Sequence, residues 1–152
     1  MPLETPDMEA INPATGEVVA TYEEDGPEAV EAALTRAMEA FESWRDRPIR
    51  ERQELLADAA DVLRDDIDEY AETMTTEMGK PIEQARSEVE KCAWVCDHYA
   101  THADAYLAPE GRAGPPEASV KTVHEPLGPV LAVMPWNFPI VKDSPVENQS
   151  TK

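Results

Sequence analysis

Two cysteines and two histidines in one stretch are the residues whose types and spacing most directly suggest chemistry. Cys92 and Cys96 are four residues apart, and so are His98 and His102, which are spacings that zinc ligands on a helix can have. On a helix, however, the cysteines fall on the apolar stripe, whereas the histidines lie about 100° or more around the axis. The four side chains would not converge on one tetrahedral point. We therefore expect no metal site, and we expect both cysteines to be small, inert residues facing the core.

A loop bounded by prolines is the second candidate. Pro135-Trp136-Asn137-Phe138-Pro139 follows the wholly apolar run Val130 to Met134. Each proline fixes its own φ angle and stiffens the loop. The apolar run predicts a short strand inside a sheet covered on both faces. Residue chemistry alone favours a rigid turn with a buried tryptophan at the end of that strand.

Other polar residues have simpler structural interpretations. Lys80 follows Gly79, the expected end of a helix, where a cation stabilises the helix dipole. We interpret Lys80 as such a dipole partner and not as a catalytic base. His124 is interpreted as an ordinary strand residue, and the acid pairs at 23–24 and 65–66 as solvated surface.

Four helices are expected before the loop, because apolar residues recur there at three- and four-residue steps. The expected ranges are 27–45, 48 to about 63, about 66–78 and about 81–107. The stripe of the first helix consists of Val30, Leu34, Ala37, Phe41 and Trp44. Pro27 suits the first position of a helix, and Gly79 suits a C-terminal cap. The last helix would be roughly 40 Å long, which is too long for the three shorter helices to cover.

Extended structure is expected on both sides of the helices. The pattern predicts a turn at 12–16, a strand at 17–22, a loop at 109–116, a strand at 119–125 and a turn at 126–129. Together with the run at 130–134, the fold class is therefore a mostly α-helical chain of about four helices followed by two or three short strands.

The charge balance limits the classes of partner. Acidic residues number 32 and basic residues 13, for a net charge of -19. Such a chain lacks the cationic footprint that binds nucleic acid or an anionic membrane. The acids are interleaved with aliphatic residues, and eight of the 13 basic residues are Arg. We interpret this as a halophilic acidic surface; an ordinary acidic protein is the alternative.

Hydropathy and cysteine usage favour the cytoplasm. No apolar run approaches the length of a transmembrane helix, and no signal peptide opens the chain. Two cysteines give no disulfide framework, which suits a reducing compartment. Residues 140–152 lack a core pattern and are net neutral, so we expect an unrelated or disordered tail.

Four segments, in this order and spacing, resemble the NAD(P)-dependent aldehyde dehydrogenase superfamily, most closely its succinate-semialdehyde dehydrogenases. They are Ile11-Asn12-Pro13-Ala14-Thr15-Gly16, Glu77-Met78-Gly79-Lys80-Pro81, Glu125-Pro126-Leu127-Gly128-Pro129-Val130 and Pro135-Trp136-Asn137-Phe138-Pro139. The resemblance covers 11–139, and the last segment is the most specific. It implies an α/β family fold of which this chain is an N-terminal fragment.

The resemblance also implies residue roles. In this family a cysteine thiolate attacks the aldehyde, hydride passes to NAD or NADP, and a glutamate activates water to release the carboxylate. Asn137 would donate its side-chain amide to the oxyanion that forms on the aldehyde oxygen, as a neutral and rigidly held donor should. Met134, Pro135 and Trp136 would lie along the nicotinamide-ribose half of the cofactor.

The same resemblance implies a division of the chain. Residues 1–26 would be an N-terminal turn and strand arm, 27–118 the helical part of the cofactor-binding domain, 119–139 strands of the intersubunit and cofactor-domain sheets ending in the loop, and 140–152 the tail. The nucleophilic cysteine, the glutamate and the pyrophosphate-binding glycine turn are not found here. We therefore expect a truncated chain that is inactive alone and does not bind the cofactor by itself.

Three functions stay open. The first is an oxidoreductase-family chain with an aldehyde substrate, whose intact relatives form homo-oligomers. The second is a non-catalytic helical interaction module that uses the stripe of 81–107. The third is half of a split enzyme, complemented by a separate C-terminal fragment.

Overall fold

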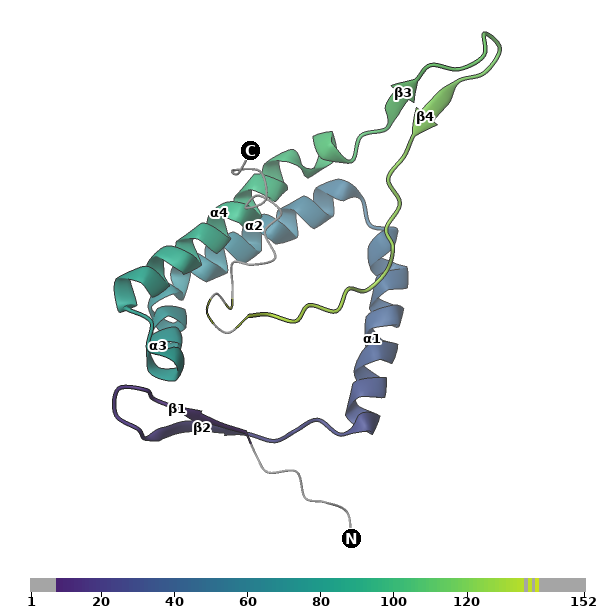
Figure 1. The fold of residues 1–152 in the computed structure, drawn as a ribbon. Coiled ribbons are helices and arrows are strands. Elements are labelled where there is room, and N and C mark those ends of the chain that lie inside the picture. Colours follow the sequence, from purple (N-terminus) through teal and green to yellow (C-terminus); the bar gives the residue numbers. More distant parts are fainter. Residues whose placement is uncertain (1–7, 136, 138, 140–152) are drawn as a thin grey trace.

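The computed structural model describes residues 8–135, 137 and 139 (Figure 1). Its elements, in chain order, are β1 (Met8–Ile11), β2 (Val18–Tyr22), α1 (Pro27–Arg45), α2 (Ile49–Asp65), α3 (Ile67–Met78), α4 (Ile82–Tyr106), β3 (Glu110–Arg112) and β4 (Val120–Thr122). Four helices followed by two short strands confirm the predicted fold class. Each helix lies within two residues of its predicted bounds.

The N-terminal strands form an antiparallel hairpin that packs beside α3. Its turn is the one predicted at 12–16: Asn12 Oδ1 accepts a 2.9 Å hydrogen bond from the Ala14 N–H, and Gly16 has a φ of 75°. The hydroxyl of Tyr22 donates a 2.8 Å hydrogen bond to Glu77 Oε1 on α3. Strand β2 was predicted and β1 was not, because four residues are too few to show a period.

Helices α2 and α4 lie side by side, and α3 packs against the first part of α4 (Figure 1). The buried cluster between α3 and α4 consists of Ala71, Met74, Ala85 and Val89. Ala60 of α2 and Ala93 of α4 are also fully buried. This core is thin because it is made mainly of alanine, whose small side chain lets the helix backbones approach closely. The cluster places the start of α4 firmly against α3.

Ion pairs join the same helices at the edge of the core. The Arg64 guanidinium on α2 lies 2.6 Å from Asp97 Oδ2 and 3.2 Å from Glu90 Oε1, both on α4. Arg86 on α4 lies 2.8 Å from Asp68 Oδ1 on α3. These carboxylates raise the pKa of both arginines, so each guanidinium remains a cationic link between helices.

Two apolar surfaces are not covered by the described residues. No residue of α1 is buried, and Val30, Leu34 and Trp44 of its predicted stripe are 48%, 56% and 43% exposed. The buried residues of α4 all lie between Ala85 and Ala93. Beyond Ala93 no residue of α4 is buried, and residues 95–100 beside α2 are half-buried, so the second half of α4 is only partly covered by the described residues.

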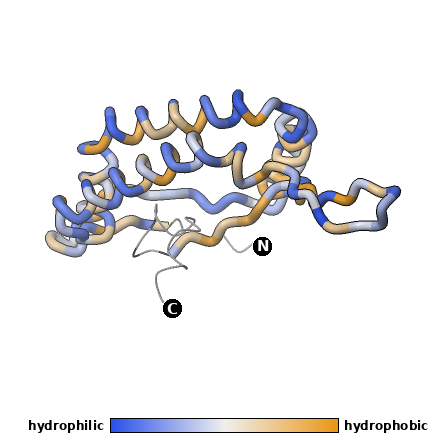
Figure 2. Tube along the Cα trace, turned by 90° about the horizontal axis from the view of Figure 1, so that it is seen from above, coloured by the Kyte–Doolittle hydropathy of each residue, from blue (hydrophilic) through white to orange (hydrophobic). Residues whose placement is uncertain are grey.

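The predicted strand at 130–134 is wrong. This segment has no regular secondary structure, and Val130 and Leu131 are 86% and 89% exposed. A strand requires a neighbour for its N–H and C=O groups, and the described residues supply none here. Figure 2 shows a largely hydrophobic trace leading to the grey C-terminal segment.

Two further predictions need correction around the second hairpin. Residues 109–116 were predicted to be a loop, but β3 lies within them and pairs antiparallel with β4, Glu110 opposite Thr122. Strand β4 is shorter than the predicted 119–125, so His124 lies beyond it. Three-residue strands depend on this pairing more than on their own sequence, which explains both errors.

Candidate functional site

The loop that ends the described chain presents Asn137 to solvent. Asn137 is exposed, while Pro135 and Pro139 on either side are half-buried. Met134 is 37% exposed. Trp136 lies outside the described residues, as do 140–152. The amide of Asn137 is therefore accessible on a segment whose neighbouring prolines are partly packed.

An ion pair lies next to the backbone of this loop, and it was not predicted from the sequence as part of the site. The Lys80 ammonium donates a hydrogen bond to Glu88 Oε2, and the two side chains are only 9% and 3% exposed. Lys80 Nζ also lies 3.5 Å from the backbone oxygen of Asn137. The predicted dipole role for Lys80 does not describe this arrangement, in which the ammonium is directed to Glu88 and to the loop.

Local structure explains how Lys80 reaches this position. Gly79 caps α3 in the left-handed conformation, with φ 75° and ψ 19°, and Pro81 precedes α4. Lys80 is therefore held in a short, rigid connection between two helices. Glu88 follows in the second turn of α4, between the buried Ala85 and Cys92. A carboxylate on an apolar stripe was the sequence signal that could have identified this pair.

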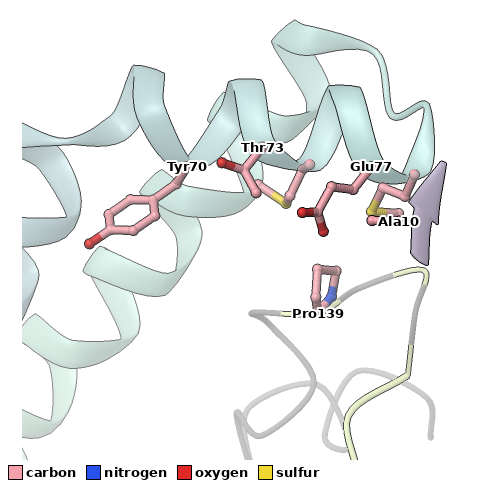
Figure 3. Close-up of a pocket in the computed structure, with 7 residues that line it drawn as sticks. Ala10, Tyr70, Thr73, Glu77 and Pro139 are labelled. Carbon is pink, nitrogen blue, oxygen red and sulfur yellow. The ribbon is translucent and has the colours of Figure 1, made fainter. Parts of the chain in front are cut away.

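A cavity of about 440 Å³ adjoins the end of the loop (Figure 3). Its described lining consists of Ala10, Tyr70, Thr73, Met74, Glu77, Met78 and Pro139. Glu77 points from α3 toward Pro139, and its hydrogen bond with Tyr22 raises the pKa of the tyrosine. No cationic side chain is among the described lining residues, so this cavity does not suit a phosphate group.

The two cysteines lack the properties of nucleophiles. Cys92 is buried on α4, and burial, followed by the nearby Glu88 carboxylate, raises the pKa of its thiol to about 11. Burial and Asp97 raise the pKa of Cys96 as well. A thiolate is the reactive form, and these thiols are protonated near neutral pH. Cys92 is thus buried as predicted, whereas Cys96 is only half-buried.

The histidines form an aromatic group on the second half of α4. The rings of His98 and His102 are 4.8 Å apart between centroids, and His98 Nε2 is 2.9 Å from the hydroxyl oxygen of Tyr106. Cys92 is buried whereas His102 is exposed. Within the described ranges no three His, Cys, Asp or Glu side chains are grouped so as to hold a metal ion.

The described residues do not fit a dinucleotide by themselves. Both of their sheets are antiparallel pairs, β1–β2 and β3–β4. A pyrophosphate site of the usual kind requires a parallel βαβ unit with a glycine turn at the helix start, and this part of the chain contains no such unit. In the same ranges, no helix combines the length and apolar character needed to cross a bilayer.

Comparisons with known proteins agree with the fold and the loop. Residues 2–142 match the profile of the aldehyde dehydrogenase family. A probable NADP-dependent succinate-semialdehyde dehydrogenase from Synechocystis is 48% identical over 130 residues, 85% of this chain and 28% of the relative. The succinate semialdehyde dehydrogenase Sad of Escherichia coli is 44% identical over 131 residues, 86% of this chain and 28% of the relative.

Solved structures give the same result. The succinic semialdehyde dehydrogenase of Streptococcus pyogenes, determined with NADP⁺, has a TM-score of 0.82 and 35% identity over 87% of this chain and 29% of that chain. Gox0499 has a TM-score of 0.85 and 31% identity over 90% of this chain and 30% of that chain. The described part of this chain thus has the fold of the corresponding part of these dehydrogenase structures.

The chain belongs to the aldehyde dehydrogenase family. Its similarity to succinate-semialdehyde dehydrogenases confirms the resemblance inferred from the four sequence segments. The chain spans about 28% of the length of these curated relatives.

Proposed function

We propose that this chain is the N-terminal segment of an NAD(P)-dependent dehydrogenase that oxidises a semialdehyde to a carboxylate, and that Asn137 is its oxyanion donor. One observation carries the assignment of Asn137: its exposed amide stands on a proline-bounded loop whose backbone is contacted by a buried ammonium. A neutral donor held in place before reaction stabilises negative charge without reorganisation at the transition state.

The remaining loop residues would contact the cofactor. Met134, Pro135 and Trp136 would lie against the nicotinamide-ribose half, and the bound NAD or NADP would accept the hydride. Relatives described as NADP-dependent support this cofactor class. Neither Cys92 nor Cys96 fits the nucleophile, because their pKa values are raised. We therefore propose that the 152 residues do not turn over aldehyde by themselves.

The uncovered apolar surfaces support the following domain organisation within a larger protein. Residues 1–26 would form an arm, 27–118 the helical part of a cofactor domain, and 119–139 strands of intersubunit and cofactor-domain sheets ending in the loop, with 140–152 as a separate tail. A C-terminal segment would cover the exposed apolar face of α1. Homo-oligomers would then form through the second hairpin.

The charge supports a protein adapted to salt. A net charge of -19 disfavours nucleic acid and anionic membranes as partners. The acid pairs Glu23-Glu24 and Asp65-Asp66 are exposed. A dense acidic shell of this kind repels itself in dilute buffer and is relieved by salt screening.

A chimaera tests the assignment directly. Residues 1–139 would be joined to the part of the Synechocystis relative that follows its matched segment, and NADPH formation from succinate semialdehyde would be measured. We expect turnover by the chimaera and none by the 152-residue chain. Asn137→Ala should lower kcat roughly 100- to 1000-fold, whereas Gln84→Ala, an exposed amide on α4, should change little. Full activity of the Asn137→Ala chimaera would refute the role of Asn137.

The alternative function is a helical interaction module. Trp94 and Tyr106 on α4 are 49% and 54% exposed, which suits a surface that contacts another protein. A folded chimaera that binds NADP but has no turnover would favour this alternative. Turnover by the unjoined 152-residue chain, abolished by Asn137→Ala, would instead overturn the proposal that the segment is inactive alone.

A further inference from the structure

We propose that Lys80 and Glu88 form a positioning pair that holds the backbone of Asn137 and thereby orients its side-chain amide. The inference rests on the proposed function for the role of Asn137, but the contact itself does not. Lys80 Nζ donates to Glu88 Oε2 and lies 3.5 Å from the Asn137 carbonyl oxygen, 57 residues further along the chain.

The pair is anchored on rigid structure. Lys80 directly precedes Pro81, and the residue before a proline is restricted to extended backbone angles. Glu88 is 4% exposed as a whole residue and lies beside the fully buried Val89. The ammonium is therefore placed by the α3–α4 junction and by the core, and it does not depend on the loop for its position.

The contact to Asn137 fixes the part of the backbone that the prolines leave free. Pro135 and Pro139 restrict their own φ angles, but the ψ angle of Asn137 sets where its carbonyl oxygen points. The Lys80 ammonium, 3.5 Å from that oxygen, favours the value of this angle that keeps the oxygen facing the charge. With the peptide held, the Cα–Cβ bond of Asn137 has a fixed direction.

Packing alone does not explain why a lysine and a glutamate are buried here. Taking two charges out of water is costly, and apolar residues of similar size often replace a buried pair without loss of stability. Two aliphatic side chains could join α3 to α4 equally well. They could not donate a hydrogen bond to the Asn137 carbonyl. The hydrogen bond to the Asn137 carbonyl is thus one interaction that an aliphatic side chain could not replace.

The test removes both charges together in the 152-residue chain. In Lys80→Met/Glu88→Leu no charge is left buried alone, so the core should remain folded. Backbone and side-chain ¹⁵N relaxation of Asn137 would be compared with that of α3 and α4. We expect the order parameter of Asn137 to fall below about 0.6 while helix values stay near 0.85. An unchanged Asn137 in the folded double variant would overturn the proposal.

Two further variants complete the experiment. Arg86→Met removes the exposed ion pairs that Arg86 of α4 makes with Asp68 on α3 and Glu83 on α4, and it should leave Asn137 unchanged. If the double variant fails to fold, Glu88→Gln keeps the size of the side chain and removes only its charge. It should also increase motion at Asn137, and rigid Asn137 in that variant would overturn the proposal equally.

A kinetic measurement separates positioning from stability. In the chimaera, the double variant should lower kcat roughly 10- to 100-fold and leave KM within about twofold, because substrate contacts are unchanged. The single variant Lys80→Arg keeps a charged donor and should therefore retain most of the kcat of the unmodified chimaera. If the unmodified chimaera has no turnover, the proposed function fails, and the relaxation measurement still decides whether the pair positions Asn137.

Discussion

Gly79 and Pro13 lie so close together that a Cβ atom on Gly79 would be 2.8 Å from Cγ of Pro13. Gly79 ends α3 with a φ of 75°, and Pro13 belongs to the turn between β1 and β2. Two independent conditions, a left-handed backbone and a close approach, therefore require glycine at this position. Gly79 directly precedes Lys80, so the backbone conformation of Gly79 also sets the direction in which the chain enters Lys80.

Gly79→Ala should destabilise the chain by about 1–3 kcal/mol, because alanine is strained in the left-handed region and its methyl group would displace Pro13. Urea unfolding followed by circular dichroism would measure the change. Gly111→Ala is the matched control, since a Cβ there meets nothing within 4 Å. Equal effects of the two substitutions would contradict the proposed constraint.

Alkaline pH should destabilise the fold through Cys92. Its pKa is raised from 9.0 to about 11 in the folded state, first by burial, so the folded chain holds the thiol proton more tightly than the unfolded chain. The stabilisation is complete below about pH 9 and is lost as pH rises to about 11. We expect a loss of roughly 1–2 kcal/mol. In Cys92→Ala the free energy of unfolding should not show this loss between about pH 9 and pH 11. Identical pH profiles of the two proteins, measured by urea unfolding, would refute the role of Cys92.

Arg64→Met should weaken the contact between α2 and α4. The substitution removes the ion pairs with Asp97 and Glu90, and the Arg64 side chain is only 34% exposed. We expect the free energy of unfolding to fall, and the fall to be smaller at molar KCl because salt screens the ion pairs. Arg112→Met, whose side chain is 57% exposed in the hairpin, should cost less than about 0.5 kcal/mol. A larger effect at Arg112 than at Arg64 would contradict this ranking.

Salt should stabilise the chain because its charge is strongly one-sided. A net charge of -19 gives self-repulsion that is unscreened in dilute buffer, where the Debye length is about 30 Å at 0.01 M. We expect Tm to rise between dilute buffer and molar KCl at pH 7. Near the isoelectric point, about pH 4.3, the rise should be smaller. A flat Tm at pH 7 would rule out salt adaptation.

The sequence by itself determined the elements whose signals are local. Apolar residues at helical spacing defined all four helices, Pro27 and Gly79 marked helix ends, and 12–16 defined a turn. Each of these depends on neighbours within a few residues, through backbone hydrogen bonds and φ preferences, so a single sequence is sufficient. The four family segments could be recognised for the same reason.

Only the tertiary structure decided the features that join distant residues. Lys80 and Asn137 are 57 positions apart, and no periodicity relates them. The apolar run at 130–134 has the composition of a strand but no partner among the described residues, because strand pairing is supplied by other segments and not by the strand itself. The loop was identifiable from the order of its residues, whereas the buried ammonium that contacts it became visible only when α3, α4 and the loop were placed together.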